Sequence, residues 1–479
     1  MLKNLLLGVM LLCLIPTRTQ VVAQSPEPVR RVNAPFFGDD AVGEHASAIF
    51  WLGQVTPTSN YADVRLGYNN QEMLIQTHVF DRRIWHSDQA MPNNYAALTQ
   101  WDAVTLYFDT RAQPGGMPDS STYRITVQVN WPGREADYRS VERGNGSGYD
   151  PITSSVSSEA VWRGDGPNND VDDRGWFMTV HVPFTSLGLS QAPAQGSVWR
   201  MAVQVHDRDD SINTVIPKTD WPERMLTNQP NTWAELGFGL PTYIAKANTN
   251  TTSQIIRQGL NKINVADATV GGGTTCADNY DYFADFGSIN HAGEEYANVQ
   301  NQSDVADWPC FSKFYLAFPL NTLPAQQVVV SATLTAYQFG NSGQGIPPTP
   351  ISSLIQAITI NEDWQEATLN WNNAPLALEN LSMARSLPMA APAQGAPVSS
   401  VPVSWDVSQA VNAAYTTQQP LRLVLYSADE AQNSGKYFWT SDVADGMAEL
   451  RPTLIVKMGV PLDLTTLKMQ TYMPVVRRD

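Results

Sequence analysis

Residues 363–375 read DWQEATLNWNNAP, and residues 451–456 read RPTLIV. In the first stretch, Trp364 and Trp371 stand on either side of an alternating polar and apolar run, which closes on two asparagines and Pro375. Alternation followed by turn-forming residues predicts a β-strand that ends at a turn. Together the two stretches indicate a β-sandwich module with tryptophans in its core, and not an active site.

Length and composition predict two folded units. The chain has 479 residues, of which 43% are hydrophobic and 16% are charged, and it contains 14 tryptophans. Domains usually contain roughly 100 to 200 residues. The formal net charge of −16 repels phosphate backbones and anionic lipid, so nucleic acid is not an expected partner.

The N-terminus predicts export. Lys3 is followed by an apolar run from Leu5 to Ile15, and small residues precede Gln24. This run is too short to span a bilayer, so residues 1–23 are expected to be a secretory signal peptide and not a membrane anchor. We therefore expect a secreted or cell-surface protein without a transmembrane segment in the mature chain.

Short β-rich runs recur along the mature chain, each ending in turn-forming residues. In the first half they lie at 103–109, 123–129, 176–184 and 199–207. In the second half they lie at 313–320, 328–339, 354–360, 421–427 and 452–458, with one short helix expected within 405–415. The predicted fold is all-β, with two antiparallel β-sandwich, jelly-roll-like domains joined by a short linker. The expected boundaries are 34–242 for the first domain, 243–254 for the linker, 255–458 for the second domain and 459–479 for a C-terminal tail.

Two cysteines remain after removal of the signal peptide. Cys276 and Cys310 form an even pair in an exported chain, which predicts a disulfide bond. Without a nearby histidine pair they would make a poor zinc site.

Several motifs in the second half occur in an order found in a known family. They are KFYLAFP at 313–319, VVVSATLTAYQF at 328–339, DWQEATLNWNNAP, SWDVSQAVNAAY at 404–415 and RPTLIV. They resemble the DNRLRE family, also classified as carbohydrate-binding module family 96. The resemblance implies an exported jelly-roll β-sandwich, often attached to polysaccharide-degrading enzymes or surface proteins. The Gly-rich segment 270–312 departs from the opening strand usual in that family.

Shorter motifs in the first half carry a second resemblance. They are WDAVTLYFDT at 101–110, YRITVQV at 123–129, GWFMTVHVPFTSLGL at 175–189, GSVWRMAVQVHDRDD at 196–210 and PNTWAELGFG at 230–239. Their order and spacing are similar to those of family 9 carbohydrate-binding modules and their DOMON-like relatives. That family clamps a pyranose between two aromatic rings, and the resemblance implies that Arg124 contacts sugar.

The two clamp positions lack aromatic residues. Before the strand that begins at Asp102 the sequence offers Leu98 and Thr99, and no aromatic residue lies between Trp221 and Trp233. The standard clamp is therefore expected to be missing. Trp85, Trp101, Trp131 and Trp221 are the other candidates for stacking on a ligand, with packing in the core as the alternative for each.

Two groups of loop aspartates could bind a hard cation such as calcium. One group is Asp170, Asp172 and Asp173, and the other is Asp207, Asp209 and Asp210. Neither has regular calcium-loop spacing, so solvated loop acids are the alternative. No other cofactor is expected.

The chain contains none of the common catalytic motifs. The six histidines are scattered, and neither HExxH nor GxSxG occurs. The first hypothesis is a secreted or cell-surface, non-catalytic protein that binds a polysaccharide or cell-surface glycan. The alternatives are a structural or adhesive envelope protein that has lost sugar binding and, third, a polysaccharide-degrading enzyme. The ending QTYMPVVRRD at 470–479 resembles that of exported Chloroflexota proteins.

Overall fold

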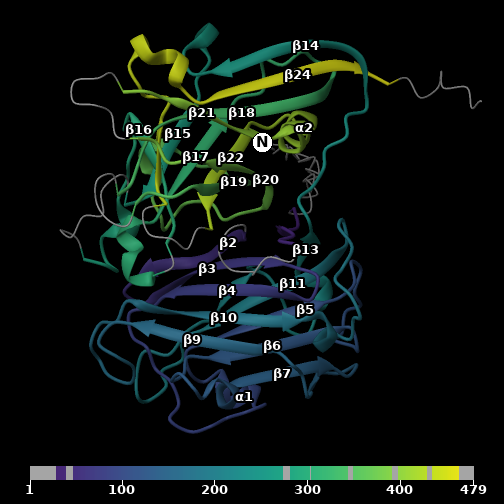
Figure 1. The fold of residues 1–479 in the computed structure, drawn as a ribbon, viewed down its shortest axis with the longest axis vertical. Coiled ribbons are helices and arrows are strands. Elements are labelled where there is room, and N and C mark those ends of the chain that lie inside the picture. The colour runs from purple at the N-terminus through teal and green to yellow at the C-terminus, as the bar shows by residue number, and fades with distance from the viewer. Residues whose placement is uncertain are drawn as a thin grey trace, which may run out of the picture.

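The computed structural model describes residues 28–38, 47–272, 281–302, 304–343, 349–390, 398–428 and 434–462. Its fold is all-β, as predicted, and its two halves lie one above the other in Figure 1. None of the helices in these ranges has the length and apolar character needed to cross a bilayer.

The first half contains strands β1 to β13 and one short helix. The strands are β1 (Arg31–Ala34), β2 (Ala48–Thr56), β3 (Ser59–Tyr68), β4 (Glu72–Phe80), β5 (Ala103–Asp109), β6 (Thr122–Gln128), β7 (Arg139–Gly144), β8 (Tyr149–Pro151), β9 (Ser157–Arg163), β10 (Gly175–Pro183), β11 (Val198–His206), β12 (Thr219–Trp221) and β13 (Ala234–Phe238). The helix is α1 (Tyr95–Leu98).

The second half contains the remaining strands and helix α2. These are β14 (Ala247–Arg257), β15 (Ala266–Gly271), β16 (Tyr296–Val299), β17 (Ser312–Phe318), β18 (Val328–Asn341), β19 (Ser353–Thr359), β20 (Glu379–Ser386), β21 (Val401–Asp406), α2 (Ser408–Thr416), β22 (Leu421–Ser427), β23 (Lys436–Trp439) and β24 (Thr453–Pro461). Short 3-10 turns are η1 (Glu135–Tyr138), η2 (Phe184–Leu187), η3 (Pro230–Thr232), η4 (Leu260–Lys262), η5 (Phe286–Ser288), η6 (Val305–Cys310), η7 (Glu366–Thr368) and η8 (Asp445–Leu450).

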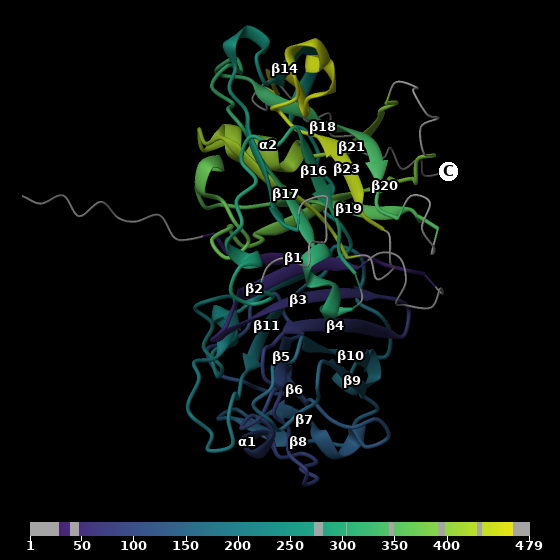
Figure 2. The same ribbon diagram turned by 90° about the vertical axis from the view of Figure 1, so that its left-hand side faces the viewer.

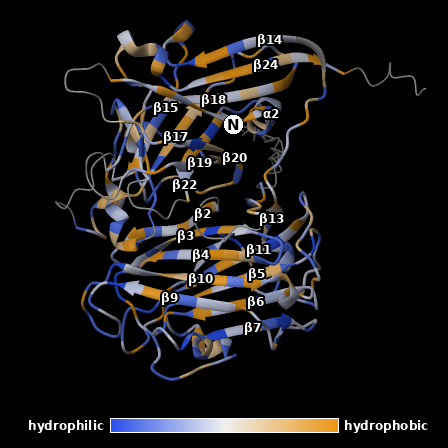
Figure 3. Ribbon diagram, in the orientation of Figure 1, coloured by the Kyte–Doolittle hydropathy of each residue, from blue (hydrophilic) through white to orange (hydrophobic). Residues whose placement is uncertain are grey.

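The strands form two sandwiches. In the N-terminal sandwich the sheet β13-β11-β5-β6-β7-β8 faces the sheet β2-β3-β4-β10-β9. In the C-terminal sandwich the sheet β15-β17-β22-β19-β20 faces the sheet β14-β24-β18-β23-β16, which has β21 beside β18. Apolar side chains alternate with polar ones along the strands (Figure 3) and fill the spaces between the facing sheets.

Strand β1 connects the two sandwiches. It pairs in parallel with β13 on one side and with β20 on the other, which joins one sheet of each sandwich into a single sheet of 13 strands. Figure 2 shows β1 at the junction of the two halves. This parallel pairing differs from the expected arrangement of separate antiparallel units. The expected linker at 243–254 also differs, because residues from Ala247 onward belong to β14, which pairs with β24.

The contact between β3 and the second half is buried. Along β3, Ala62, Val64 and Leu66 belong to the core of the N-terminal sandwich, whereas the alternate side chains, Tyr61, Asp63 and Arg65, make buried contacts with residues of the second half. Lys313 Nζ donates to Tyr61 Oη at 2.7 Å, and Arg65 Nη2 donates to Asn301 Oδ1 at 2.5 Å. Both faces of β3 are therefore covered by protein.

The predicted strand runs are confirmed, and each overlaps a strand of the structure. The short helix is confirmed as α2 (Ser408–Thr416). The strand predicted at 363–375 is wrong, because this stretch contains only the turn η7 and irregular backbone. Asn370 Oδ1 accepts from the backbone amides of Asn372 and Asn373, and such local bonds compete with a strand ladder. The core role of its tryptophans is confirmed, since Trp371 is buried and Trp364 packs against the same cluster.

Candidate functional site

Arg124 lies on the outward face of the sheet that contains β5, β6 and β7. The strand register places Tyr107 on β5 and Glu142 on β7 directly beside it. Opposite side chains on neighbouring strands are separated by roughly 5 Å, so these three residues form a row across the sheet. On the same strands, the side chains that face the core of the N-terminal sandwich are Leu106, Ile125 and Val141.

Partners surround the guanidinium group of Arg124. Its Nε donates to Glu142 Oε2 at 2.5 Å. Its Cζ lies 3.5 Å from the ring centroid of Tyr95 and 4.4 Å from that of Tyr149. The ion pair and the two ring contacts hold the guanidinium in place. Arg124 is thus an ordered residue at the centre of this face, and not a solvated strand arginine.

Further polar groups lie next to this row. Gln204 on β11 donates through Nε2 to Asp220 Oδ1 at 2.8 Å, and its Oε1 accepts from Tyr107 Oη at 3.4 Å. Trp233 packs against Tyr107 with ring centroids 5.3 Å apart. Aromatic rings can stack on the apolar face of a pyranose, while amides, carboxylates and guanidinium groups can satisfy its hydroxyls. We call the face formed by Tyr95, Arg124, Glu142, Tyr149 and Gln204 the Arg124 face.

Tyr95 and Tyr149 are residues that sequence reasoning missed. Tyr95 opens α1, where the Asn94 side chain caps the helix by accepting from the amide of Ala97 at 3.1 Å. A wider window before the strand at Asp102 would have included Tyr95. Nothing in the sequence connects it with Tyr149, which the β7–β8 pairing brings to this face.

The four candidate tryptophans do not gather around Arg124. Trp221 is fully buried and stacks on Phe50 at 3.8 Å, so it is a core residue and its proposed ligand role is corrected. Trp85 is also buried. Trp101 stacks against the guanidinium of Arg208, with 3.8 Å between Cζ and the ring centroid. Trp131 is 45% exposed, and its ring lies nearly perpendicular to that of Trp162, with the two ring centroids 4.5 Å apart.

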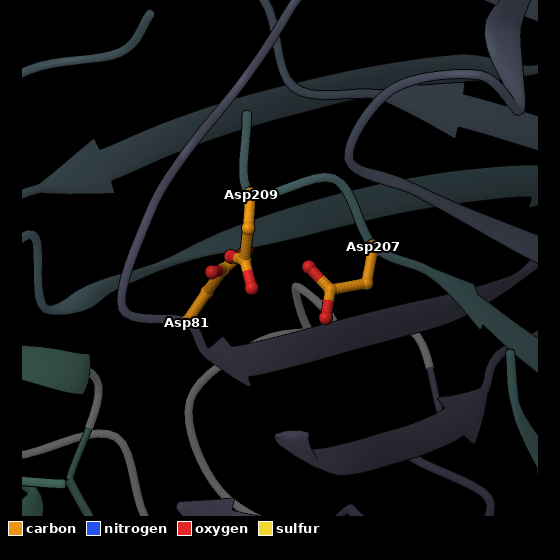
Figure 4. Close-up of side chains that lie close together, drawn as sticks. All are labelled: Asp81, Asp207 and Asp209. Atoms are coloured by element: carbon orange, nitrogen blue, oxygen red, sulfur yellow. The ribbon is translucent and has the colours of Figure 1, made fainter. Parts of the chain in front are cut away.

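Three aspartates from two loops of the N-terminal sandwich lie close together (Figure 4). Asp81 directly follows β4, and Asp207 and Asp209 follow β11. One carboxylate oxygen from each lies within 4.8 Å of the others. Two of the oxygens, Asp81 Oδ2 and Asp207 Oδ1, are buried and have no hydrogen-bond partner among the described residues.

Burial raises the pKa values of these carboxyl groups. The pKa of Asp81 is well above its usual value because the residue is fully buried, with additional repulsion from Asp207 and Asp209. Burial and the neighbouring Asp209 raise the pKa of Asp207 to about 7. Buried acids that repel one another are costly, and oxygen ligands at this spacing suit a hard cation.

The predicted aspartate groups are corrected in part. Within the described ranges, Asp170, Asp172 and Asp173 do not form a metal-binding group. Asp172 pairs with Arg82 at 2.7 Å, and Asp173 accepts backbone amides of Ile84 and Gly166. Asp210 accepts from the amide of Thr214 instead of joining Asp207 and Asp209. The missed member is Asp81, which, like Asp207, directly follows a strand.

The predicted disulfide bond cannot be placed, because Cys276 lies outside the described residues. Cys310 ends η6 (Val305–Cys310). The pairing of the two cysteines stays a prediction.

Comparison with known proteins gives matches among solved structures. A family 9 carbohydrate-binding module from Caldicellulosiruptor kristjanssonii in complex with glucose is 13% identical, and the match covers 45% of this chain and 99% of that chain at a TM-score of 0.30. A module of the same family and organism in complex with cellotriose is 13% identical over 46% of this chain and 100% of that chain, at a TM-score of 0.29. A proposed carbohydrate-binding protein from Bacteroides uniformis is 12% identical over 44% of this chain and 99% of that chain, at a TM-score of 0.34.

No curated protein matches the chain. The second half gives a match of a different kind, to a family model and not to a single structure. Residues 261–456 match carbohydrate-binding module family 96, which confirms the resemblance expected for the C-terminal unit.

Proposed function

We propose that this chain is a secreted or cell-surface, non-catalytic protein that binds polysaccharide. The observation that carries the proposal is the family match over residues 261–456, since that family consists of carbohydrate-binding modules. The predicted signal peptide at 1–23 supports export. The absence of common catalytic motifs from the sequence supports a binding role over a degradative one.

The Arg124 face supports the same proposal for the N-terminal sandwich. It places a guanidinium, a carboxylate and an amide beside tyrosine rings on one sheet surface. These are the kinds of group that satisfy sugar hydroxyls and stack on a sugar's apolar face. Glu142 and Gln204 are buried, so a sugar would reach them only after displacing the side chains that cover them.

A binding experiment on the full mature chain tests the proposal. The protein is screened on a glycan array and then run on native gels that contain xylan, hydroxyethylcellulose or alginate. Retardation by at least one polysaccharide is expected. Arg124→Ala should weaken retardation if the Arg124 face binds, whereas Arg143→Ala, which removes an exposed arginine from β7, should not. Hydrolysis of any polysaccharide would instead support an enzyme.

One observation favours the alternative of a structural or adhesive envelope protein. Arg124 itself fills the space between Tyr95 and Tyr149 and is paired with Glu142. A sugar that used these rings as a clamp would have to displace that side chain. If the full chain binds no glycan at all, this alternative replaces the proposed function.

We also propose that Asp81, Asp207 and Asp209 bind a calcium ion. Three carboxylates from two loops would each contribute an oxygen, and the ion would neutralise acids that are otherwise repelled and buried. The ion would tie the loop after β4 to the loop after β11. Its role would be structural, because Asp81 is fully buried and a polysaccharide could not reach it.

A further inference from the structure

Four aromatic side chains lie together on the outer sheet of the C-terminal sandwich. They are Tyr296 on β16, Phe339 on β18, and Tyr437 and Trp439 on β23. We call them the aromatic strip. They come from adjacent strands, since β23 pairs with β16 on one side and with β18 on the other.

The rings of the aromatic strip contact one another. Trp439 and Phe339 are stacked, with centroids 4.1 Å apart and ring planes 23° from parallel. Tyr437 lies 6.2 Å from Phe339, and Tyr296 lies 6.5 Å from it. Phe339 is therefore the central ring.

A bulge in β18 produces this arrangement. Gln338 pairs with Phe438 and Gly340 pairs with Tyr437, which leaves Phe339 as the extra residue. Such bulges redirect side chains. A Cβ atom at Gly340 would lie only 3.2 Å from Cδ2 of Tyr437, so glycine leaves room for that ring.

The core of the C-terminal sandwich does not use these rings. The core side chains of the same strands are Ala297, Ala336 and Phe438, which point to the opposite face of the sheet. The rings of the aromatic strip are instead partly exposed, and Tyr296 has 38% of its surface accessible. Grouped aromatic rings that remain open to water mark an interaction surface.

The charged residues near the aromatic strip indicate which class of ligand it suits. Outward positions along β18 and β21 near the strip carry hydroxyl groups, and Thr335 Oγ1 lies 2.8 Å from Ser404 Oγ. Asp406, the nearest acid on β21, is opposite Thr333, six residues before Phe339 and so about 20 Å along the strand. Glu294 and Glu295 directly precede Tyr296, and their carbonyls accept from Thr440, which follows Trp439, so acidic residues lie at one end of the strip. Acidic neighbours on a chain with net charge −16 disfavour a polyanion and suit a neutral ligand.

We propose that the aromatic strip binds a neutral polysaccharide by stacking on its pyranose rings. This inference rests on the proposed function and adds both a site and a ligand class to it. The strip lies on the opposite sandwich from the Arg124 face, so the chain would carry two separate sugar-binding surfaces.

Native gels that contain hydroxyethylcellulose, xylan or alginate test this site with the full mature chain. The double variant Phe339→Ala/Trp439→Ala should bind the neutral polysaccharides at least tenfold more weakly, and Tyr296→Ala should show a smaller loss in the same direction. Phe36→Ala removes an exposed ring from the other sandwich and should bind like the wild type. Unchanged circular dichroism and melting temperature confirm that each variant is folded.

The outcomes separate this inference from the proposed function. If the wild type binds no polysaccharide, the proposed function fails. If it binds a neutral polysaccharide and the double variant binds equally well, only the aromatic strip is overturned. Binding to alginate alone also overturns the neutral ligand. A wild-type dimer in gel filtration that the double variant dissociates would show that a second copy of the chain covers the rings.

Discussion

At the scale of single residues, the cluster of Asp81, Asp207 and Asp209 has the clearest chemical consequence. Burial and the neighbouring Asp209 raise the pKa of Asp207 to about 7. An acid with a raised folded-state pKa favours folding while it is protonated. Without metal, this contribution is present below the unfolded pKa of about 4 and is lost as the pH rises through the folded pKa.

Calcium should reverse this trend, because it binds the ionised carboxylates. We expect calcium affinity to increase between about pH 5 and about pH 8, the interval in which Asp207 ionises. Excess calcium should therefore raise the melting temperature much more at the higher pH. Differential scanning fluorimetry with calcium or a chelator measures this effect. At a calcium concentration of about 100 times the Kd, the gain in unfolding free energy would be about 2.7 kcal/mol.

Asp81→Asn provides the decisive variant. It keeps the size of the side chain and removes one ligand charge, so the calcium effect should disappear while the metal-free protein becomes more stable at high pH. Asp210→Asn serves as the control, since that side chain accepts the Thr214 amide outside the group. An equal calcium effect in wild type and Asp81→Asn would contradict a metal site here.

At the scale of elements, the stretch 363–375 acts as a docking loop. The Asn372 side chain bonds the backbone of Val55 on β2 in both directions, with Val55 N donating to Oδ1 at 2.9 Å and Nδ2 donating to Val55 O at 2.9 Å. Gln54 Nε2 also donates to the Asn372 carbonyl at 2.7 Å. The loop of the C-terminal sandwich therefore satisfies backbone groups of the N-terminal sandwich.

Asn372→Ala should destabilise the protein by about 1–3 kcal/mol, because partly buried backbone groups of Val55 lose their partners. Asn373→Ala is the matched control, since its side chain bonds to Asn370 and Thr368 within the loop. Urea unfolding followed by tryptophan fluorescence measures both variants. If Asn373→Ala lowers the free energy of unfolding as much as Asn372→Ala does, the conformation of the loop and not its contact with Val55 stabilises the protein.

Much of the fold at this scale could be predicted from the sequence. Strands such as β5 and β11 were found because alternation and turn residues are local signals. The docking loop was predicted as a strand because its alternation is a local signal, whereas its docking bond joins Asn372 to a strand more than 300 residues away in sequence. Asp81 and Tyr149 were missed because their neighbours come from other strands, whereas Tyr95 lies just outside the window considered before Asp102. In β3, the alternation of Tyr61, Asp63 and Arg65 with apolar residues is the usual pattern of a solvent-exposed face, yet both faces are buried.

At the scale of the whole molecule, the junction between the sandwiches contains buried polar groups that are hydrogen-bonded to one another. Asp63 accepts from Tyr61 Oη at 2.6 Å, Tyr426 Oη at 2.9 Å and Asn301 Nδ2 at 3.1 Å. Burial keeps the pKa of Lys313 well below its usual value, and its Nζ lies 3.7 Å from the ring centroid of Trp371 and 4.1 Å from that of Trp51. Separating the sandwiches would expose these groups and the apolar rings around them.

The whole chain should therefore unfold in one transition. Calorimetry should give equal calorimetric and van't Hoff enthalpies, and hydrogen exchange of peptides from β6 and from β24 should respond together to denaturant. Lys313→Ala leaves a cavity between the sandwiches. It should lower the free energy of unfolding by about 2–5 kcal/mol, as measured by hydrogen exchange in the peptides from β6 and in those from β24. Lys313→Met keeps most of the ring contacts and should lower it less. Two separate transitions, with Lys313→Ala shifting only the C-terminal one, would mean that the sandwiches fold independently despite the shared sheet.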